Sequence, residues 1–391
     1  LSKMNYADRA AYVLGLFLTD YSEDELSEMA KKAYSRRNFG CNPAPLSRLE
    51  NDYVLELWHG PTSAFKDMAL QIMPMLLSKS LEKTGEKRDA LILVATSGDT
   101  GKAALEGYKN VPRVSIQVFY PESGVSNIQR RQMQTQEGRN VGVCAIRGNF
   151  DDAQTGVKKI FFAVSKDQLL EGKGVRLSSA NSINIGRLAP QVVYYYRAYA
   201  DLVQAGRIQP GDKVDYVVPT GNFGDILAGY FAKRAGLPVG KLLCASNSNN
   251  VLTDFLRTGV YDKNRPFLRT MSPSMDILVS SNLERLLFDL SGCDGARIAR
   301  FMGDLAGKKR YAIDDAMKAA LQQRYFAGCV DENGVREEIR RTWAENHYLM
   351  DTHTAVASAV LRAYPAQTVL SMQNTLYTDC VYAVSSLNEL P

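Results

Sequence analysis

The chain has 391 residues, a length that allows about two or three domains, and 45% of these residues are hydrophobic and 23% charged. Such proportions are ordinary for a globular protein and exclude a disordered chain, a collagen-like repeat and a disulfide-stapled miniprotein. The 47 lysines and arginines exceed the 42 aspartates and glutamates by 5. Because this small excess is not gathered into a basic stripe, we expect a small-molecule substrate and no nucleic-acid partner.

No apolar run reaches the roughly 20 residues that cross a bilayer, so we expect neither a membrane span nor a membrane partner. The first residues lack the pattern of a signal peptide. Because the chain begins with Leu1 and not with methionine, we expect it to be a fragment that lacks its natural N-terminus. Six cysteines without a CxxC pair and only three histidines predict no metal site, and they favour reduced thiols in a cytoplasmic protein.

Hydrophobic periodicity predicts an alternation of helices and strands. Residues 7–34 predict two helices, and Ser22 and Glu25 have capping-box spacing at the start of the second. Further on, the expected strands are 90–95, 114–119, 141–146, 214–218 and 242–245, and the expected helices between them are 102–108, 127–136 and 224–235. Apolar strands that are each followed by a helix indicate an α/β fold with parallel sheets. The turn clusters 85–89 and 206–212 are candidate linkers.

The turn after the strand 90–95 reads ATSGDTG and contains Thr96, Ser97, Gly98, Asp99 and Thr100. In an open parallel sheet, ligands bind where such turns present hydroxyl and N–H groups at a helix start. The turn therefore suits a carboxylate or a phosphate. The alternative is a capped helix start with glycine for turn geometry.

A second turn, PTGNFGD at 219–225, follows the strand-like run 214–218. Gly221 and Gly224 flank Asn222 and Phe223 and permit close approach of the backbone to an anion, while the helix dipole favours a phosphate. The turn is neither a P-loop nor a GxGxxG motif. A plain strand–turn–helix connection is the alternative.

Lys66 lies between Phe65 and Asp67 at the start of an apolar-periodic helix. A helix N-terminus and a neighbouring aromatic ring both disfavour the ammonium form, which would make the amine a better Schiff-base nucleophile. The alternative is an ordinary solvated surface lysine.

A fourth stretch, SSANSINIGR at 178–187, is rich in small hydrogen-bonding side chains. Arg187 follows Asn184 by three residues, a spacing that places both on one helix face, and it could clamp a phosphate with two hydrogen bonds. A capped helix with a surface arginine is the alternative.

Together and in this order, these motifs resemble the threonine synthases, which are pyridoxal-phosphate enzymes of fold type II, the tryptophan synthase β superfamily. The resemblance extends from about residue 5 to residue 368. It is carried by HGPTSAFKDMALQ (59–71), ATSGDTGKAALEG (95–107), GNFDDAQTGVKKIF (148–161), SSANSINIGRLAPQVVYYY (178–196), PTGNFGDILAGYFAKRAGLPVGKLLCASN (219–247), MSPSMDILVSSNLERLL (271–287) and DTHTAVASAVL (351–361).

The resemblance implies a role for each motif. Lys66 would be the Schiff-base lysine and the acid–base group, and Asp99 would lie near the pyridoxal ring. The cofactor phosphate would be held by Gly221, Asn222, Phe223, Gly224 and Asp225. The substrate α-carboxylate would be held by Thr96, Ser97, Gly98 and Thr100, and the substrate phosphate by Ser182, Asn184 and Arg187. For His59 and His353, structural roles are favoured.

The reaction implied is the conversion of O-phospho-L-homoserine and water to L-threonine and phosphate, catalysed by a carbon–oxygen lyase in threonine biosynthesis. A related phospho-lyase or serine/threonine dehydratase that releases a keto acid is an alternative within the enzymes. A ligand-binding paralogue without catalysis is the alternative from another class.

The resemblance also implies an α/β fold of two doubly wound domains with the active site in the cleft between them. We expect residues 1–87 to form the N-terminal part of a large domain that carries Lys66, 88–180 a small α/β domain, and 181–391 the remainder of the large domain with the phosphate-binding loop.

The sequence departs from the family near its C-terminus. After the strand-like residues 368–370 the family reads Ser-Thr-Ala-Ser-Pro, and the threonine hydroxyl bonds the pyridine nitrogen. Here Met372 takes the place of that threonine, and a thioether is only a weak acceptor. We expect either Ser371 or Thr375 to substitute for it, or the last twenty or so residues to be atypical.

Overall fold

The computed structural model describes residues 1, 3–49, 52–96, 98–123, 125–167, 170, 172–364 and 380–384. The chain forms two compact units that exchange segments along the sequence. Unit 1 comprises Leu1–Lys3, Ala44–Leu57 and Gln191–Pro391. Unit 2 comprises Met4–Pro43 and Trp58–Pro190.

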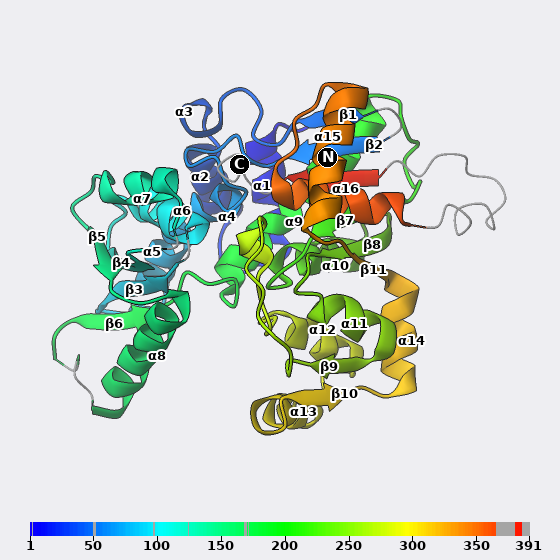
Figure 1. Cartoon of the computed structure of the whole chain (residues 1–391). Helices are drawn as coiled ribbons and strands as arrows, with labels where there is room; N and C mark the ends of the chain where they lie inside the picture. The colour runs from blue at the N-terminus through cyan, green and yellow to red at the C-terminus, as the bar shows by residue number, and fades with distance from the viewer. Residues whose placement is uncertain are drawn as a thin grey trace. The chain divides into compact units, whose positions relative to one another are not determined.

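Unit 2 is built on a four-stranded parallel sheet with the strand order β5-β4-β3-β6 (Figure 1). Its strands are β3 (Asp89–Ala95), β4 (Val114–Pro121), β5 (Val141–Ile146) and β6 (Val175–Ser178). Strands β3 and β4 alternate with helices in sequence and carry buried residues such as Ile92 and Val118. The parallel sheet predicted from the apolar runs is confirmed.

The helices of unit 2 either precede strand β3 in the sequence or lie between the strands of this sheet. They are α1 (Tyr6–Gly15), α2 (Glu23–Ala33), α3 (Arg36–Phe39), α4 (Asp67–Leu70), α5 (Met73–Lys83), α6 (Asp99–Tyr108), α7 (Asn127–Gln134) and α8 (Phe150–Asp167). The two helices expected in 7–34 are confirmed as α1 and α2. At the start of α2, the Ser22 hydroxyl accepts from the Glu25 N–H group and the Glu25 carboxylate accepts from the Ser22 N–H group, which is the predicted capping box.

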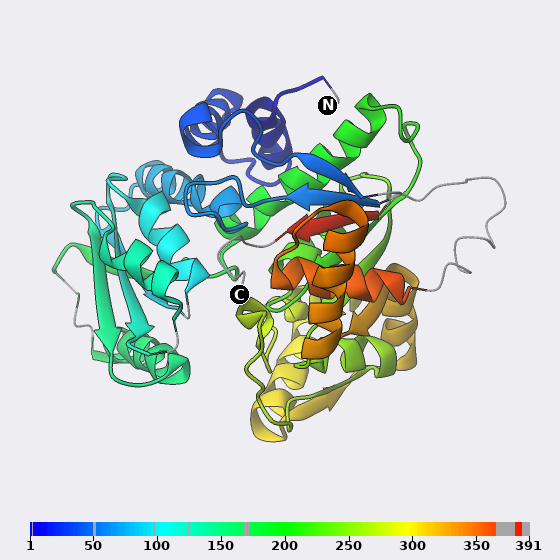
Figure 2. The ribbon, with the colours of Figure 1, turned by 45° about the horizontal axis from the view of Figure 1, so that its top comes forward.

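Unit 1 is built on a six-stranded sheet with the strand order β1-β2-β12-β7-β8-β11. The strands are β1 (Leu46–Leu49), β2 (Asp52–Glu56), β7 (Val214–Pro219), β8 (Val239–Ser246), β11 (Tyr325–Cys329) and β12 (Cys380–Val384). All neighbours are parallel except β1 and β2. Figure 2 shows β12, in red, beside β2, in blue, so the last described strand completes a sheet that begins near residue 46.

Helices and a small second sheet complete unit 1. They are α10 (Gly224–Arg234), α11 (Val251–Thr258), β9 (Val260–Asp262), the 3₁₀ turn η1 (Pro273–Met275), α12 (Leu283–Leu290), α13 (Gly295–Gly307), β10 (Arg310–Ala312), α14 (Asp315–Arg324), α15 (Glu332–Asn346) and α16 (Thr352–Arg362). Strands β9 and β10 pair antiparallel. Helix α9 (Ile185–Gln204) contains Pro190 and passes from one unit to the other.

The two units have bounds that differ from the domain division expected from the sequence. The segment with Lys66 belongs to the same unit as the strands β3–β6, because helix α4 packs against α6 and the Tyr34 hydroxyl donates to the Met68 carbonyl at 2.7 Å. The candidate linkers 85–89 and 206–212 each lie inside one unit, not between units. A turn rich in glycine and charge is common to linkers and to surface loops, so composition did not distinguish them.

The apolar-periodic helix expected after Lys66 is broken in two. Helix α4 ends at Leu70, and α5 starts at Met73 with Pro74 in its first turn. Proline has no N–H group and cannot donate to the carbonyl four residues earlier, which is that of Leu70. That carbonyl oxygen points instead at Gly107 of α6, where a Cβ atom would overlap it.

We therefore expect Gly107→Ala to lower the free energy of unfolding by about 3 kcal/mol, because the new methyl group meets backbone that cannot rotate away. Gly156→Ala is the matched control, since Gly156 lies in α8 of the same unit, and outside that helix's own backbone and the neighbouring residues the described part of the chain places nothing within 4 Å of its added Cβ. That change should stabilise the helix by up to about 1 kcal/mol. Urea denaturation of both variants tests the packing, and equal effects would contradict it.

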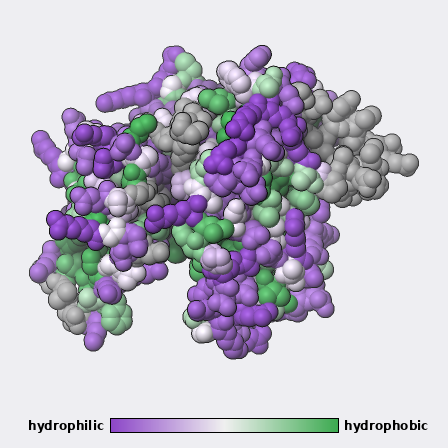
Figure 3. All heavy atoms as spheres, viewed as in Figure 1, coloured by the Kyte–Doolittle hydropathy of each residue, from purple (hydrophilic) through white to green (hydrophobic). Residues whose placement is uncertain are grey.

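The face drawn in Figure 3 is mostly hydrophilic, with hydrophobic atoms in small separate areas. Isolated exposed apolar side chains such as Phe162 and Trp343 are normal for a folded surface. None of the described helices combines the length and apolar content needed to cross a bilayer.

Candidate active-site residues

Lys66 is the N-cap residue of α4, and only 7% of its surface is exposed. Its Nζ atom donates to Asp99 Oδ2 at 3.0 Å and lies 4.6 Å from the centre of the Phe65 ring. The ordinary solvated lysine is thus excluded. The sequence argument considered only the helix N-terminus and Phe65, and the structure adds a carboxylate at hydrogen-bond distance.

Asp99 is the first residue of α6, is buried, and has partners on two other segments of the chain. Its Oδ1 atom accepts from Gln129 Nε2 at 2.8 Å, while its Oδ2 atom faces Lys66. Gln129 approaches so closely that a Cβ atom at Gly98 would overlap its amide oxygen. Gly98 also has a φ of +155°, a backbone conformation that L side chains rarely adopt, so the backbone itself requires glycine here.

The loop before Lys66 is tied to Asp67. The Thr62 N–H and hydroxyl groups both donate to the Asp67 carboxylate at 2.8 Å. Asp67 is fully buried, and burial raises the pKa of its carboxyl group to about 7, against the smaller effect of these hydrogen bonds. The Asp67 side chain therefore fixes the loop that precedes Lys66 and is not a ligand-binding group.

This pKa predicts a dependence of stability on pH. Between the ordinary value of 3.8 and about 7, the unfolded chain has released the Asp67 proton and the folded chain retains it, so stability falls as the pH rises. The expected slope is about −1.4 kcal/mol per pH unit from this group. Asp67→Asn should remove that slope in urea denaturation between pH 5 and 7. A variant with the slope of the original chain would contradict the assignment.

The other residues of the turn 96–100 have different surroundings. The Thr96 hydroxyl accepts from the Gly98 and Gly101 N–H groups at 3.0 and 2.9 Å, so it organises the turn. Thr100 is partly exposed in the first turn of α6, and Ser97 lies outside the described residues. The binding of a substrate carboxylate by this turn stays a prediction.

Arg187 lies in the first turn of α9 and is buried, so the surface arginine considered as an alternative is excluded. Its Nη1 atom donates to the Ala180 carbonyl at 2.8 Å. Burial lowers the pKa of the guanidinium group to about 10, and an incoming phosphate would offset this cost of burying a cation. Asn184 caps the start of α9 through the Gly186 N–H group, and Ser182 is half-buried in the preceding turn.

The loop of residues 221–225 joins β7 to α10 in unit 1. A Cβ atom at Gly221 would lie 2.8 Å from the Ser274 carbonyl oxygen, so the turn η1 packs directly on this glycine. The Ser280 hydroxyl donates to the Gly221 carbonyl, and the Asn282 N–H and side-chain amide groups donate to the Asn222 carbonyl. These bonds direct the loop carbonyls into the protein.

The N-terminus of α10 follows Phe223, whose φ of +64° is left-handed. Phe223 is buried and caps the helix without a side-chain hydrogen bond, so the first N–H groups of α10 are not satisfied by the cap residue. The predicted contact of Phe223 and Gly224 with an anion is therefore limited to their backbone.

Asp225 also points inward. Its carboxylate accepts from the hydroxyls of Tyr194 and Tyr195 at 2.6 and 2.9 Å, and burial raises the pKa of its carboxyl group to about 6. A carboxylate held in this way repels a phosphate, so only the N–H group of Asp225 suits the predicted role. The side chain braces the start of α10 against α9.

The two histidines discussed from the sequence have structural contacts. The rings of Trp58 and His59 stack at 3.9 Å. His353 is buried in α16, and its Nε2 atom accepts from the Ser274 N–H group at 3.2 Å. Through Ser274, His353 fixes the turn that packs on Gly221.

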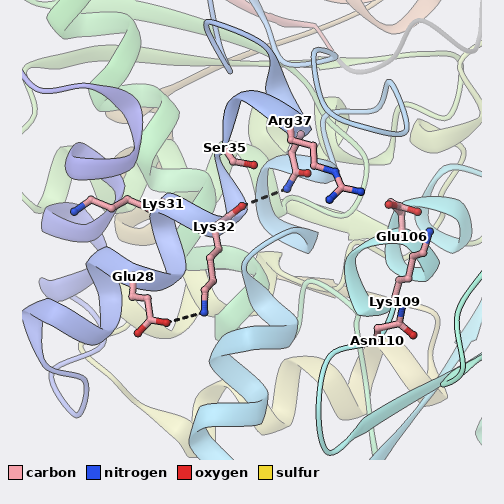
Figure 4. A pocket seen from close by; sticks show the side chains of 9 residues that line it. Glu28, Lys31, Lys32, Ser35, Arg37, Glu106, Lys109 and Asn110 are labelled. Atoms are coloured by element: carbon pink, nitrogen blue, oxygen red, sulfur yellow. Dashed lines mark hydrogen bonds and ion pairs between the residues drawn. The ribbon is translucent and has the colours of Figure 1, made fainter.

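A hollow of about 710 Å³ lies in unit 2 at α2, α3 and the end of α6. It is lined by Glu28, Lys31, Lys32, Ser35, Arg37, Asn38, Glu106, Lys109 and Asn110. Figure 4 shows that Glu28 pairs with Lys32 and that Arg37 and Glu106 extend into the hollow from opposite sides. None of the predicted site residues lines this hollow. Asp99, for example, lies at the opposite end of α6 from Glu106 and Lys109.

Among the residues described, no three side chains of histidine, cysteine, aspartate or glutamate are grouped to hold a metal ion. The predicted pyridine-nitrogen partners Ser371 and Thr375, and Met372, lie outside the described residues.

Sequence reasoning missed several residues that the structure places beside the predicted ones. They are Thr62, Asp67, Lys102, Gln129, Tyr194, Tyr195, Ser280 and Asn282. All of these residues except Gln129 lie inside the motifs that carry the resemblance, so the sequence marked their segments but not their individual contacts. Gln129 lies outside those motifs, 30 residues from its partner Asp99, and Asn282 is 60 residues from its partner Asn222.

No protein-family model matches the chain. Among curated proteins, human threonine synthase-like 1 is 42% identical over 366 residues, which cover 91% of this chain and 49% of the relative. The chain thus spans about half the length of the threonine synthase-like relatives it matches. The threonine synthase of Saccharomyces cerevisiae is 36% identical over 380 residues, which cover 91% of this chain and 72% of the relative.

Among solved structures, the PLP-bound threonine synthase of Brucella melitensis aligns with a TM-score of 0.87 at 36% identity, over 98% of this chain and 78% of that chain. The threonine synthase of yeast aligns with a TM-score of 0.86 at 32% identity, over 98% and 78% of the two chains.

Proposed function

The chain belongs to the threonine synthase family, and from this membership we propose that it is a pyridoxal-phosphate-dependent lyase that converts O-phospho-L-homoserine and water to L-threonine and phosphate. The Brucella relative binds pyridoxal phosphate, as its name states, and the yeast relative is named for the synthase reaction. When bound, the cofactor would supply an electron sink for the carbon atoms of the substrate.

The observation that carries this proposal is the setting of Lys66. Its amine is buried, it lies at the end of a loop fixed by Asp67, and its direction is set by Asp99 at 3.0 Å. A buried, oriented amine is what condensation with an aldehyde requires. The same amine would then move protons at the carbon atoms that react.

The loop of residues 221–225 supports a second part of the proposal, the binding of the cofactor phosphate. Its carbonyls are held by Ser280 and Asn282, and the first N–H groups of α10 carry the positive end of the helix dipole. The residues therefore fit a phosphate held by backbone N–H groups. Larger side chains at Gly221 are excluded by the turn η1.

For the substrate, we propose that the turn 96–100 binds the carboxylate and that Arg187 binds the phosphate that leaves, with Ser182 and Asn184 beside it. Departure of phosphate as a dianion requires positive charge or hydrogen-bond donors at the oxygens that become negative. A buried guanidinium group supplies both, and burial lowers the pKa of the Arg187 guanidinium.

Borohydride reduction of the protein incubated with pyridoxal phosphate, followed by peptide mapping, tests the cofactor assignment. A pyridoxyl group on Lys66 is expected, and a label on any other lysine in its place would end the proposal. Assays of phosphate, threonine and keto acid released from O-phospho-L-homoserine then test the reaction. Threonine and phosphate in equal amounts support a synthase, whereas a keto acid without threonine identifies a phospho-lyase or dehydratase, and no turnover identifies a binding paralogue.

A further inference from the structure

Lys102 is a second lysine of the Lys66 surroundings, and neither the resemblance nor the proposed chemistry gives it a role. Only 1% of its surface is exposed, whereas lysines are almost never fully buried unless they are paired. Its Nζ atom lies 3.9 Å from Asp99 Oδ1. The residue is one turn further along α6 than Asp99, so the helix itself places the two together.

The Lys102 ammonium group is also held by the loop that precedes Lys66. Its Nζ atom donates to the Thr62 carbonyl at 2.8 Å, and Thr62 is the residue whose N–H and hydroxyl groups bind Asp67. This hydrogen bond therefore holds the Lys102 ammonium group at a fixed position. Asp99 accordingly lies between two ammonium groups, Lys66 on Oδ2 and Lys102 on the side of Oδ1.

Lys66 cannot remain an ammonium group if it is to react with an aldehyde, because only the neutral amine is a nucleophile. When Lys66 becomes neutral, the buried Asp99 carboxylate loses its closest cation. A buried carboxylate without a compensating charge takes up a proton or moves. In this scheme Lys102 is not the amine that reacts with the aldehyde, so that step leaves its charge beside Asp99.

We propose that Lys102 is a positioning residue for Lys66: its ammonium group keeps Asp99 ionised and in place when Lys66 is neutral, and so lowers the pH at which Lys66 becomes nucleophilic. This inference rests on the proposed role of Lys66 as the lysine that bonds pyridoxal phosphate. Its physical basis is that a neighbouring cation both stabilises the carboxylate and disfavours a second ammonium group beside it.

The test uses the full chain and measures how fast Lys66 reacts with pyridoxal phosphate as a function of pH. At each pH, borohydride stops the reaction and mass spectrometry of the Lys66 peptide gives the labelled fraction. In Lys102→Met the midpoint of this profile should move up by about one pH unit, because one of two cations near Asp99 is gone. Lys109→Met, which removes a cation beyond the far end of α6, should leave the midpoint unchanged.

Two further variants separate charge from anchoring. Lys102→Arg retains the charge and should keep the midpoint within a few tenths of a pH unit of the original. Lys102→Gln can still donate to the Thr62 carbonyl but is neutral, so it should shift the midpoint as Lys102→Met does, and it serves if the methionine variant does not fold.

An unchanged midpoint in the methionine and glutamine variants, with Lys66 still labelled, overturns the inference and leaves the proposed function intact. Such variants would show only lower thermal stability, as expected for a lysine that merely anchors the loop. Label on a lysine other than Lys66 in the original chain overturns both.

Discussion

Lys66→Ala should lower the rate of O-phospho-L-homoserine turnover by about 10³-fold or more, because the variant lacks both the amine that bonds the cofactor and the group that moves protons. The loss should appear in the maximal rate and not only at low substrate concentration. The borohydride-stable label on peptide 59–71 should also disappear. Both are measured on the purified chain with an excess of pyridoxal phosphate.

Two controls make this result specific. Lys109→Ala removes a partly exposed lysine from the end of α6 and should leave the rate unchanged within twofold. Added methylamine should restore part of the activity of Lys66→Ala, since a small amine can enter the space left beside Asp99. A Lys66→Ala protein that retains more than about a tenth of the original rate would contradict the assignment of the lysine.

Arg187→Met should lower kcat/KM for O-phospho-L-homoserine by about 10²- to 10³-fold, which corresponds to the loss of one charge-assisted contact to the phosphate. The affinity for pyridoxal phosphate, measured by titration of its absorbance, should change by less than threefold. This split between substrate and cofactor follows from the proposed position of Arg187 at the substrate phosphate. Equal losses in both measurements would contradict it.

Arg197→Met is the matched control, because Arg197 lies on the same helix and forms an ion pair with Asp201. Loss of such a partly exposed pair costs at most about 1 kcal/mol of stability and should leave catalysis unchanged. Thermal denaturation of both variants separates loss of fold from loss of binding. Arg187→Lys distinguishes charge from geometry, since lysine cannot form the two parallel hydrogen bonds of a guanidinium group.

Local sequence patterns predicted the secondary structure correctly where the buried residues of a segment recur at the spacing of a helix or a strand. Strand β3 and the capping box at Ser22 are examples, because an apolar run and the Ser–Glu spacing have few other solutions. The break after Leu70 was missed, although Pro74 marked it, because the apolar spacing continues across the break. The division into units also differs from the expected one, because residues 4–43 and 58–87 belong to the unit of strands β3–β6 and not to the unit of the six-stranded sheet.

For the candidate site, the motifs were sufficient to single out Lys66, Asp99 and the loop of residues 221–225, since each combines an unusual residue set with a helix start. The type of each side chain did not predict which groups surround it in the folded chain. Lys66 was expected beside an aromatic ring, and only the folded chain shows the carboxylate that faces it. Asp225 was expected among the residues that hold the cofactor phosphate, and the tyrosines of α9 show that its carboxylate faces inward.

The order of residues along the chain was enough to establish an α/β protein and its family and to predict a reactive lysine at residue 66, because these depend on short stretches with few alternative explanations. Which charges surround that lysine was settled only by folding. Gln129, Lys102 and Thr62 meet there from segments up to about 70 residues apart, and the strength of a charge depends on burial and on neighbours that no local stretch contains.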